Sequence, residues 1–272
     1  MYRQRFELTA TPLAKNAQGR TFFDKTPGHQ RLHRRFTQLA QEPGLALLTA
    51  EPGVGKTAAI RNECALLPKP DYLVVYVADT STSPLDVYRT VALELGVRAS
   101  HRRTQLWTDI KKTLFHLVDE RHISPILILD EAQHLSDRFL LDLSGFLNFT
   151  FDSRDLLTLW LVGLTPLLQH VRQQQHAALL SRVVCHEHLE PLDRDCFGAF
   201  IDHGLSAVGA TKKLLSDPAL EMLFRASRGV PRQASKLLRA ALYRSDEAAQ
   251  AFVDERIMEA AISDLLLSQG AS

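Results

Sequence analysis

Cysteine is scarce in this sequence, and its placement excludes two common uses of the residue. The 272 residues include three cysteines, Cys64, Cys185 and Cys196, and none of them belongs to a C-x-x-C motif. An odd number of cysteines without metal-binding spacing argues against a disulfide framework and against a zinc site. The pattern instead predicts reduced, mostly buried thiols in a cytoplasmic protein.

Net charge and long apolar runs are equally scarce. Lys and Arg number 32 and Asp and Glu number 31, which gives a formal net charge of +1. The chain lacks the overall basic bias of many DNA-binding proteins, so any contact with nucleic acid must come from local patches. The longest apolar stretch, residues 156–168, is interrupted by Thr158, Gly163 and Pro166 and is too short to span a membrane. Because the N-terminus also has no apolar signal core, we expect no membrane association.

The most informative feature that is present is a phosphate-binding loop, the run AEPGVGKT at residues 50–57. It follows a short apolar run that predicts a buried strand, and a helical pattern begins at Lys56. In this context glycine lets backbone N–H groups converge on phosphate oxygens, and the helix N-terminus adds partial positive charge. The motif departs from its usual pattern at Ala50, where glycine is expected.

The order of residues in this loop assigns roles to them. We predict that Lys56 reaches the β- and γ-phosphates of ATP and that the Thr57 hydroxyl binds Mg²⁺. The residues predicted to contact the nucleotide are Pro52, Gly53, Val54, Gly55, Lys56, Thr57 and Ala58.

An acidic pair, Asp130 and Glu131, follows a second apolar run at residues 126–129. Parallel strands deliver the residues that follow them to the edge of the sheet where ligands bind. We predict that Asp130 holds Mg²⁺ and that Glu131 polarises the attacking water. An acidic helix N-terminus would explain one of these carboxylates but not the pair. Together the two motifs predict an enzyme that binds ATP with Mg²⁺ and hydrolyses it.

Strand and helix patterns alternate through the first 190 residues and then change. The alternation predicts an α/β fold with a parallel sheet covered by helices on both faces. After Pro191 only amphipathic helical patterns remain. We therefore expect a nucleotide-binding core with an N-terminal extension at residues 1–190 and a small helical lid at residues 191–272. The expected strands are 45–49, 72–78, 126–129, 157–162 and 183–189. The expected helices are 56–67, 85–95, 104–120, 137–149, 166–174, 195–208, 217–226, 231–244 and 254–267.

An α/β core with these two motifs and a helical lid resembles the AAA+ ATPases. The resemblance implies that Arg182, just before the last strand, reaches the γ-phosphate of a neighbouring subunit as a trans arginine finger. It implies a sensor 2 role for Arg232, in the run GVPR, which contacts the bound phosphates in cis, and a sensor 1 role for Thr165. Each residue has an alternative explanation. Arg182 could be a surface arginine at the strand edge, and Arg232 a surface residue of a helix N-terminus. Thr165 could be a helix N-cap ahead of Pro166.

Three further runs resemble the ExeA/GspA-type branch of these ATPases: the N-terminal twelve residues, GHQ at 28–30 and DEAQHL at 130–135. That branch includes the transposition regulators of the TniB, TnsC, MuB and IstB kind. The resemblance implies a homo-oligomer, a ring or helical filament, that assembles on double-stranded DNA with ATP and recruits a transposase or its adaptor. The secretion member carries a membrane span and a cell-wall-binding region after its ATPase. The sequence ends at Ser272 with neither, which favours the transposition hypothesis.

Basic residues precede the helix expected at 104–120 and form the best candidate for DNA contact. A helix N-terminus with arginine and threonine beside it suits a phosphate, so we predict non-specific backbone contacts by Arg102, Arg103 and Thr104. A solvated basic loop is the alternative. Two other functions remain open: a stand-alone secretion-type ATPase that acts on a protein partner, and an ATP-switched adaptor with little turnover.

Overall fold

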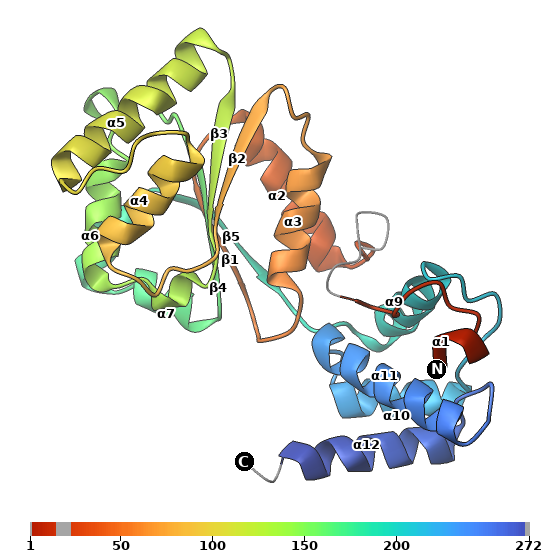
Figure 1. The fold of residues 1–272 in the computed structure, drawn as a ribbon. Helices are drawn as coiled ribbons and strands as arrows, with labels where there is room; N and C mark the ends of the chain where they lie inside the picture. The colour runs from red at the N-terminus through yellow and green to blue at the C-terminus, as the bar shows by residue number, and fades with distance from the viewer. Residues whose placement is uncertain (1, 15–22, 270–272) are drawn as a thin grey trace. The chain divides into compact units, whose positions relative to one another are not determined.

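A five-stranded parallel sheet organises the first part of the chain in the computed structural model, which describes residues 2–14 and 23–269 (Figure 1). The strands lie in the order β2-β3-β4-β1-β5, and every neighbouring pair is parallel. The prediction of an α/β fold with a parallel sheet is confirmed. The strands are β1 (Leu45–Ala50), β2 (Tyr72–Val77), β3 (Ser124–Leu129), β4 (Thr158–Gly163) and β5 (Val183–Leu189), each within two residues of its predicted bounds.

Burial explains why these strands are apolar almost throughout. Every residue of β1 and β4 is buried, as are all residues of β3 after Ser124. A parallel sheet needs a crossover between each pair of strands, and the crossover helices cover both faces. The central strands therefore have no solvent face, and polar groups collect where each strand ends.

Helices lie on both faces of the sheet (Figure 1). One face is covered by α2 (Pro27–Gln41) and α3 (Lys56–Leu66), and there Phe36 stacks on Trp160 with 5.6 Å between ring centroids. The opposite face is covered by the remaining long helices of this part of the chain, whose apolar side chains form one continuous core with the sheet. These helices are α4 (Pro84–Glu94), α5 (Arg103–Phe115), α6 (Asp137–Phe146) and α7 (Pro166–Val171). The short elements are η2 (His116–Glu120), η3 (Ala132–His134), η4 (Thr150–Asp152), η5 (Gln174–His176) and α8 (Ala177–Leu180).

The single helix predicted at residues 104–120 consists of two segments that differ in their hydrogen-bonding pattern. The α-helical pattern of α5 ends at Phe115, and the π-helical turn η2 carries the chain to Glu120. The apolar periodicity that predicted one long helix does not distinguish these two hydrogen-bonding patterns.

Contacts divide the chain into two units. The α/β unit contains Pro27–Pro52 and Ala59–Leu189, and the helical unit contains Met1–Thr26, Gly53–Ala58 and Glu190–Ser272. The sequence-based division counted the N-terminal extension with the α/β core. In the structure its apolar residues instead join the core of the helical unit.

The helical unit is built around the apolar faces of α9 (Arg194–Ser206), α10 (Asp217–Ser227), α11 (Pro231–Glu247) and α12 (Glu255–Gln269). The short helix α1 (Tyr2–Arg5) packs with them, and Tyr2, Phe6, Leu8 and Phe23 are buried among their side chains. Tyr2 meets Tyr243 of α11 edge to face, with 4.6 Å between ring centroids. These contacts explain why the extension, which carries no strand pattern, belongs with helices.

A close backbone approach fixes the start of α11. Gly229 has a φ of +70°, and a Cβ at this position would lie 2.0 Å from the carbonyl oxygen of Leu192. The N–H of Leu192 donates to the Gly229 carbonyl at 2.9 Å. Only glycine satisfies both the backbone angle and the approach. No helix within the described ranges is long and apolar enough to cross a membrane.

The buried N-terminal aromatic residues should contribute to stability. Phe6 is 5% exposed, and we expect Phe6→Ala to lower the free energy of unfolding by about 3 kcal/mol, because it leaves a cavity in the helical unit. Urea unfolding followed by circular dichroism at 222 nm measures the loss. Phe151→Ala is the matched control, since Phe151 is fully exposed, at 102%. Equal losses for the two variants would contradict the packing described here.

Candidate nucleotide-binding site

The loop between β1 and α3 has the backbone that a phosphate-binding loop needs. Gly53 and Gly55 have φ values of +88° and +116°, in the region that side-chain-bearing residues rarely adopt. A Cβ at Gly53 would lie 2.9 Å from Arg232 Cβ and 3.1 Å from Val230 Cγ1. The Arg232 N–H donates to the Gly53 carbonyl oxygen at 3.2 Å. The structure thus brings the predicted sensor 2 residue to the predicted loop.

The departure at Ala50 causes no backbone strain. Ala50 is the last residue of β1, is fully buried and lies in register with Leu189 of β5. Its φ is not among the positive values of the chain, so the position does not require glycine. Lys56 and Thr57 follow as the first two residues of α3, where Lys56 is 7% exposed and Thr57 is exposed.

Two hydrogen bonds orient the buried carboxylate of Asp130, which is 3% exposed. The Tyr76 hydroxyl, from the neighbouring strand β2, donates to Oδ2 at 2.8 Å, and the Glu131 N–H donates to Oδ1 at 2.8 Å. Burial raises the pKa of Tyr76 above its usual value, and the hydrogen bond to Asp130 raises it further. Tyr76 therefore remains a donor well above neutral pH.

The turn after Asp130 is held by Thr80. The Thr80 hydroxyl lies 3.1 Å from the carbonyl oxygen of Asp130 and 2.7 Å from that of Glu131. Glu131 itself has a φ of +51°, an uncommon value for a non-glycine residue that persists where its surroundings fix it. Thr80 is one of the residues that fix it.

Gln133 positions the carboxylate of Glu131. Its amide Nε2 donates to Glu131 Oε2 at 2.7 Å, and its Oε1 accepts from the Leu164 N–H at 2.9 Å. The amide therefore connects the exposed Glu131 to the chain that follows β4. Gln133 lies in the DEAQHL run, but a bridge over 31 residues leaves no local pattern in the sequence that would assign it a role.

Thr165 also faces a neighbouring strand end. Its hydroxyl donates to Glu51 Oε1 at 2.7 Å and makes no capping hydrogen bond at α7. Thr165 is the N-cap residue of α7, as the alternative expects, but its side chain bonds to Glu51 and does not cap the helix. Glu51 follows β1 directly and was not assigned a role from the sequence.

Arg182 lies just before β5 and forms an ion pair with Asp152 at 2.5 Å. Its side chain is 22% exposed and that of Asp152 is 52% exposed. Asp152 belongs to a turn in which Thr150, Phe151 and Asp152 have φ values of +47°, +55° and +62°. Arg182 is thus held within its own chain by a residue that the sequence analysis did not single out.

The candidate DNA-contact residues differ in their surroundings. The Arg103 guanidinium pairs with Asp142 at 2.7 Å and lies 4.2 Å from the centre of the Trp107 ring. Arg102 and Thr104 are exposed at the start of α5, Arg102 as its N-cap residue. The structure therefore leaves Arg102 and Thr104 at the surface and commits Arg103 to two intramolecular contacts.

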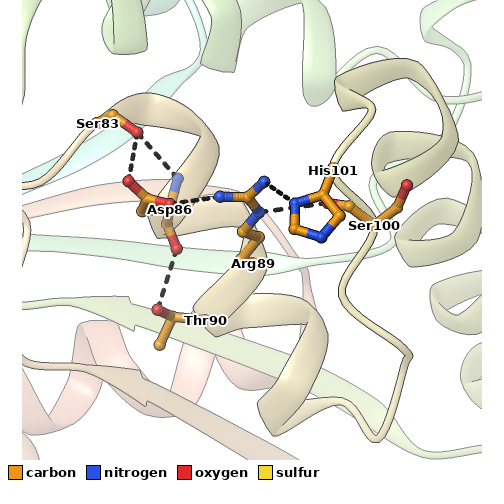
Figure 2. A network of polar contacts seen from close by, with 6 residues as sticks. All are labelled: Ser83, Asp86, Arg89, Thr90, Ser100 and His101. Carbon is orange, nitrogen blue, oxygen red and sulfur yellow. Dashed lines mark hydrogen bonds and ion pairs between the residues drawn. The ribbon is translucent and has the colours of Figure 1, made fainter.

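The loop before α5 is tied to α4 by a polar network (Figure 2). Arg89 donates to Asp86 Oδ1 at 2.8 Å, to His101 Nδ1 at 2.9 Å and to the Ser100 carbonyl at 3.3 Å. Asp86 in turn accepts from the hydroxyl of Ser83, the N-cap residue of α4, at 2.6 Å. The network fixes the loop that presents Arg102.

The Tyr76–Asp130 hydrogen bond gives a testable dependence of stability on pH. The pKa of Tyr76 is higher in the folded protein than in the unfolded chain. The stabilisation that the hydrogen bond gives to the folded state is therefore fully present below a pH of about 10, where the unfolded phenol ionises, and is lost as the pH rises further. We expect the stability advantage of the wild type over Tyr76→Phe to be constant from pH 8 to about pH 10 and to shrink above that pH. Urea unfolding of both proteins at each pH measures this advantage, and an advantage that does not shrink above about pH 10 would contradict the assignment.

Comparison with known proteins agrees with this fold. A family model described as an AAA domain matches residues 38–171. General secretion pathway protein A of Aeromonas hydrophila is 28% identical over 240 residues, which cover 85% of this chain and 42% of that protein. The chain therefore spans less than half the length of this curated relative.

Solved structures with the same fold include two ORC proteins and a RuvB motor. The ORC2 protein of Aeropyrum pernix has a TM-score of 0.70 at 14% identity, covering 93% of this chain and 70% of its own. The ORC1 protein of Aeropyrum pernix in complex with DNA has a TM-score of 0.67 at 17% identity, covering 93% and 68%. The RuvB Holliday junction branch migration motor of Thermotoga maritima has a TM-score of 0.59 at 17% identity, covering 90% and 70%. At these identities the likeness shows the fold alone. This chain therefore has the fold of these solved structures, and its residues 38–171 match the AAA domain model.

Proposed function

We propose that this chain binds ATP with Mg²⁺ and hydrolyses it. The observation that carries the proposal is the pair of carboxylates after β3: Asp130 is buried and oriented by two donors, and Glu131 is held by Gln133. An in-line displacement at phosphorus needs an oriented water and a held metal, and this pair offers one carboxylate for each task.

The residues of the site fit both the nucleotide and the metal. Mg²⁺ prefers oxygen ligands, and the Asp130 carboxylate and the Thr57 hydroxyl supply them. When bound, the ion would neutralise charge on the transferred phosphoryl group. The backbone of Gly53 and Gly55 is shaped for phosphate, and Lys56 begins the helix beside it. In this proposal the nucleotide contacts run from Pro52 through Ala58.

Three further residues complete the proposed mechanism. Arg232 acts as sensor 2, which its backbone contact to Gly53 supports. Thr165 acts as sensor 1, supported by its hydrogen bond to Glu51 at the end of β1. Arg182 acts in trans on the γ-phosphate of a neighbouring copy, which requires a homo-oligomer, a ring or helical filament, and requires Arg182 to leave Asp152.

For the target of this activity we propose double-stranded DNA, with recruitment of a transposase or a transposition adaptor. The resemblance of three sequence runs to the ExeA/GspA-type branch supports it, as does the exposed Arg102 at the N-terminus of α5. A neighbour of the same fold was solved in complex with DNA. Contacts by Arg102 and Thr104 would go to the phosphate backbone and would be largely indifferent to sequence.

A protein target is the second candidate, and one specific observation favours it. The curated relative at 28% identity is named for general secretion. On this alternative the same ATPase site acts on a protein partner, and the exposed residues of α5 are a solvated surface.

Turnover should depend on Glu131 and, more weakly, on Gln133. We expect Glu131→Gln to retain ATP binding but to lower kcat by about 100-fold or more, because the attacking water loses its base. Gln133→Leu should lower kcat about 10-fold by releasing the Glu131 carboxylate. Phosphate release and fluorescent-nucleotide binding are measured with and without DNA. Glu94→Gln, an exposed carboxylate on α4, is the control. Identical behaviour of Glu131→Gln and the wild type in every assay would favour an ATP-switched adaptor with little turnover.

DNA binding should require the ATP state. We expect the fluorescence anisotropy of a labelled random duplex to rise with a non-hydrolysable ATP analogue and not with ADP or without nucleotide. Binding should weaken steeply between two salt concentrations, since phosphate contacts release counterions. Arg102→Ala should weaken binding more than Arg103→Ala, whose guanidinium is held by Asp142 and Trp107. Failure to bind DNA in every state, with nucleotide binding verified, would favour the protein target.

A further inference from the structure

We propose that Asp137, His170 and His176 form a binding site for a transition-metal cation, with Zn²⁺ as the best fit. His170 Nε2 lies 2.6 Å and His176 Nε2 lies 3.0 Å from the same oxygen, Asp137 Oδ1. The three ligand atoms all lie within 4.8 Å of one another. Among the side chains that the structure describes, no other group of three His, Cys, Asp or Glu residues brings its ligand atoms this close together.

The donor set matches the chemistry of zinc and differs from that of magnesium. Two imidazoles and one carboxylate are the three protein ligands of many zinc sites that keep a fourth, open position. Magnesium prefers oxygen ligands throughout. In a tetrahedral zinc site the ligand atoms are about 3.4 Å apart, so the observed 2.6 and 3.0 Å separations require the ligands to spread by less than about 1 Å.

The two histidines of the group are largely buried and held in place, whereas Asp137 is exposed and free to adjust. The His176 side chain is 0% exposed and that of His170 is 21% exposed, whereas that of Asp137 is 54% exposed. The buried His176 finds no partner for Nδ1, so its polar contacts are all made through Nε2, which points at the carboxylate. The exposed Asp137 can shift to admit an ion, and its solvent side leaves room for a water ligand.

Three separate elements supply the ligands. Asp137 is the first residue of α6, His170 lies in the last turn of α7, and His176 ends η5. The α6 helix follows the turn that carries Glu131 and Gln133, and α7 follows Thr165. A bound ion would therefore crosslink the segments that follow β3 and β4, independently of nucleotide.

The cysteines do not compete for the ion at neutral pH. A thiol must ionise to bind zinc well. Burial raises the pKa of Cys64 to about 12 and that of Cys185 to about 11, and it also raises the pKa of Cys196, so zinc would have to displace a tightly held proton from each thiol. Binding measured near neutral pH therefore reports on the histidine and carboxylate ligands.

The test uses the full chain with any purification tag removed and without nucleotide. Zn²⁺ affinity is measured by competition with a chromophoric chelator in excess Mg²⁺, and Co²⁺ is added separately to record its visible spectrum. We expect about one ion per chain, an intense tetrahedral Co²⁺ spectrum and a rise in Tm that EDTA reverses. Asp137→Asn and His170→Gln, both at partly exposed positions, should each lower affinity at least about 10-fold.

His116→Gln is the matched control. His116 is 53% exposed and pairs with Glu120, so it is a histidine–carboxylate pair without a third ligand, and its removal should leave affinity unchanged. Absence of Zn²⁺ binding by the folded wild type would overturn the proposal and identify the group as a hydrogen-bonded triad. Equal affinity in the wild type, Asp137→Asn and His170→Gln would overturn it as well.

Discussion

The parallel pairing of β3, β4 and β1 is the constraint on which the candidate site depends. These strands are neighbours in the sheet, and in a parallel sheet the chain leaves every strand at the same edge. Residues that are far apart in sequence must then meet there: Glu51 after β1, Asp130 after β3 and Leu164 after β4. Because the strands are buried on both faces, polar groups collect at this edge, and hydrogen bonds from Tyr76 and Glu131 compensate for the burial of the Asp130 carboxylate there.

Side-chain hydrogen bonds join the strand ends in the order of the sheet. Tyr76 of β2 reaches Asp130 after β3, Gln133 reaches Leu164 after β4, and Thr165 reaches Glu51 after β1. Each bond connects neighbouring strands, so the four ends form one continuous polar row. A change at one strand end alters the hydrogen-bonding partners available at the next. The free energies that these hydrogen bonds contribute are therefore not simply additive.

The sequence predicts the elements of this row but not its connections. Apolar runs located all five strands, and the glycine-rich and acidic motifs located Lys56, Asp130 and Glu131, because those signals are local. Tyr76 looked like an ordinary strand residue, and Glu51 like an unassigned loop residue, since their partners lie 54 and 114 positions away. The same reason hid the Asp137 group, whose ligands come from three elements with no metal-binding spacing. Arg103 shows the converse: a basic run predicted a contact with the DNA backbone, and in the structure its guanidinium pairs with Asp142.

The turn that carries Asp152 bears on how easily Arg182 can change partners. Three consecutive non-glycine residues with left-handed backbone angles each cost about 1 kcal/mol or more relative to right-handed conformations. The turn is closed by its own contacts, because the N–H and the hydroxyl of Ser153 both donate to the Thr150 carbonyl oxygen. It therefore holds the Asp152 carboxylate in place whether or not Arg182 is bound. Since both side chains of the pair are partly exposed, the departure of Arg182 costs about 1 kcal/mol or less.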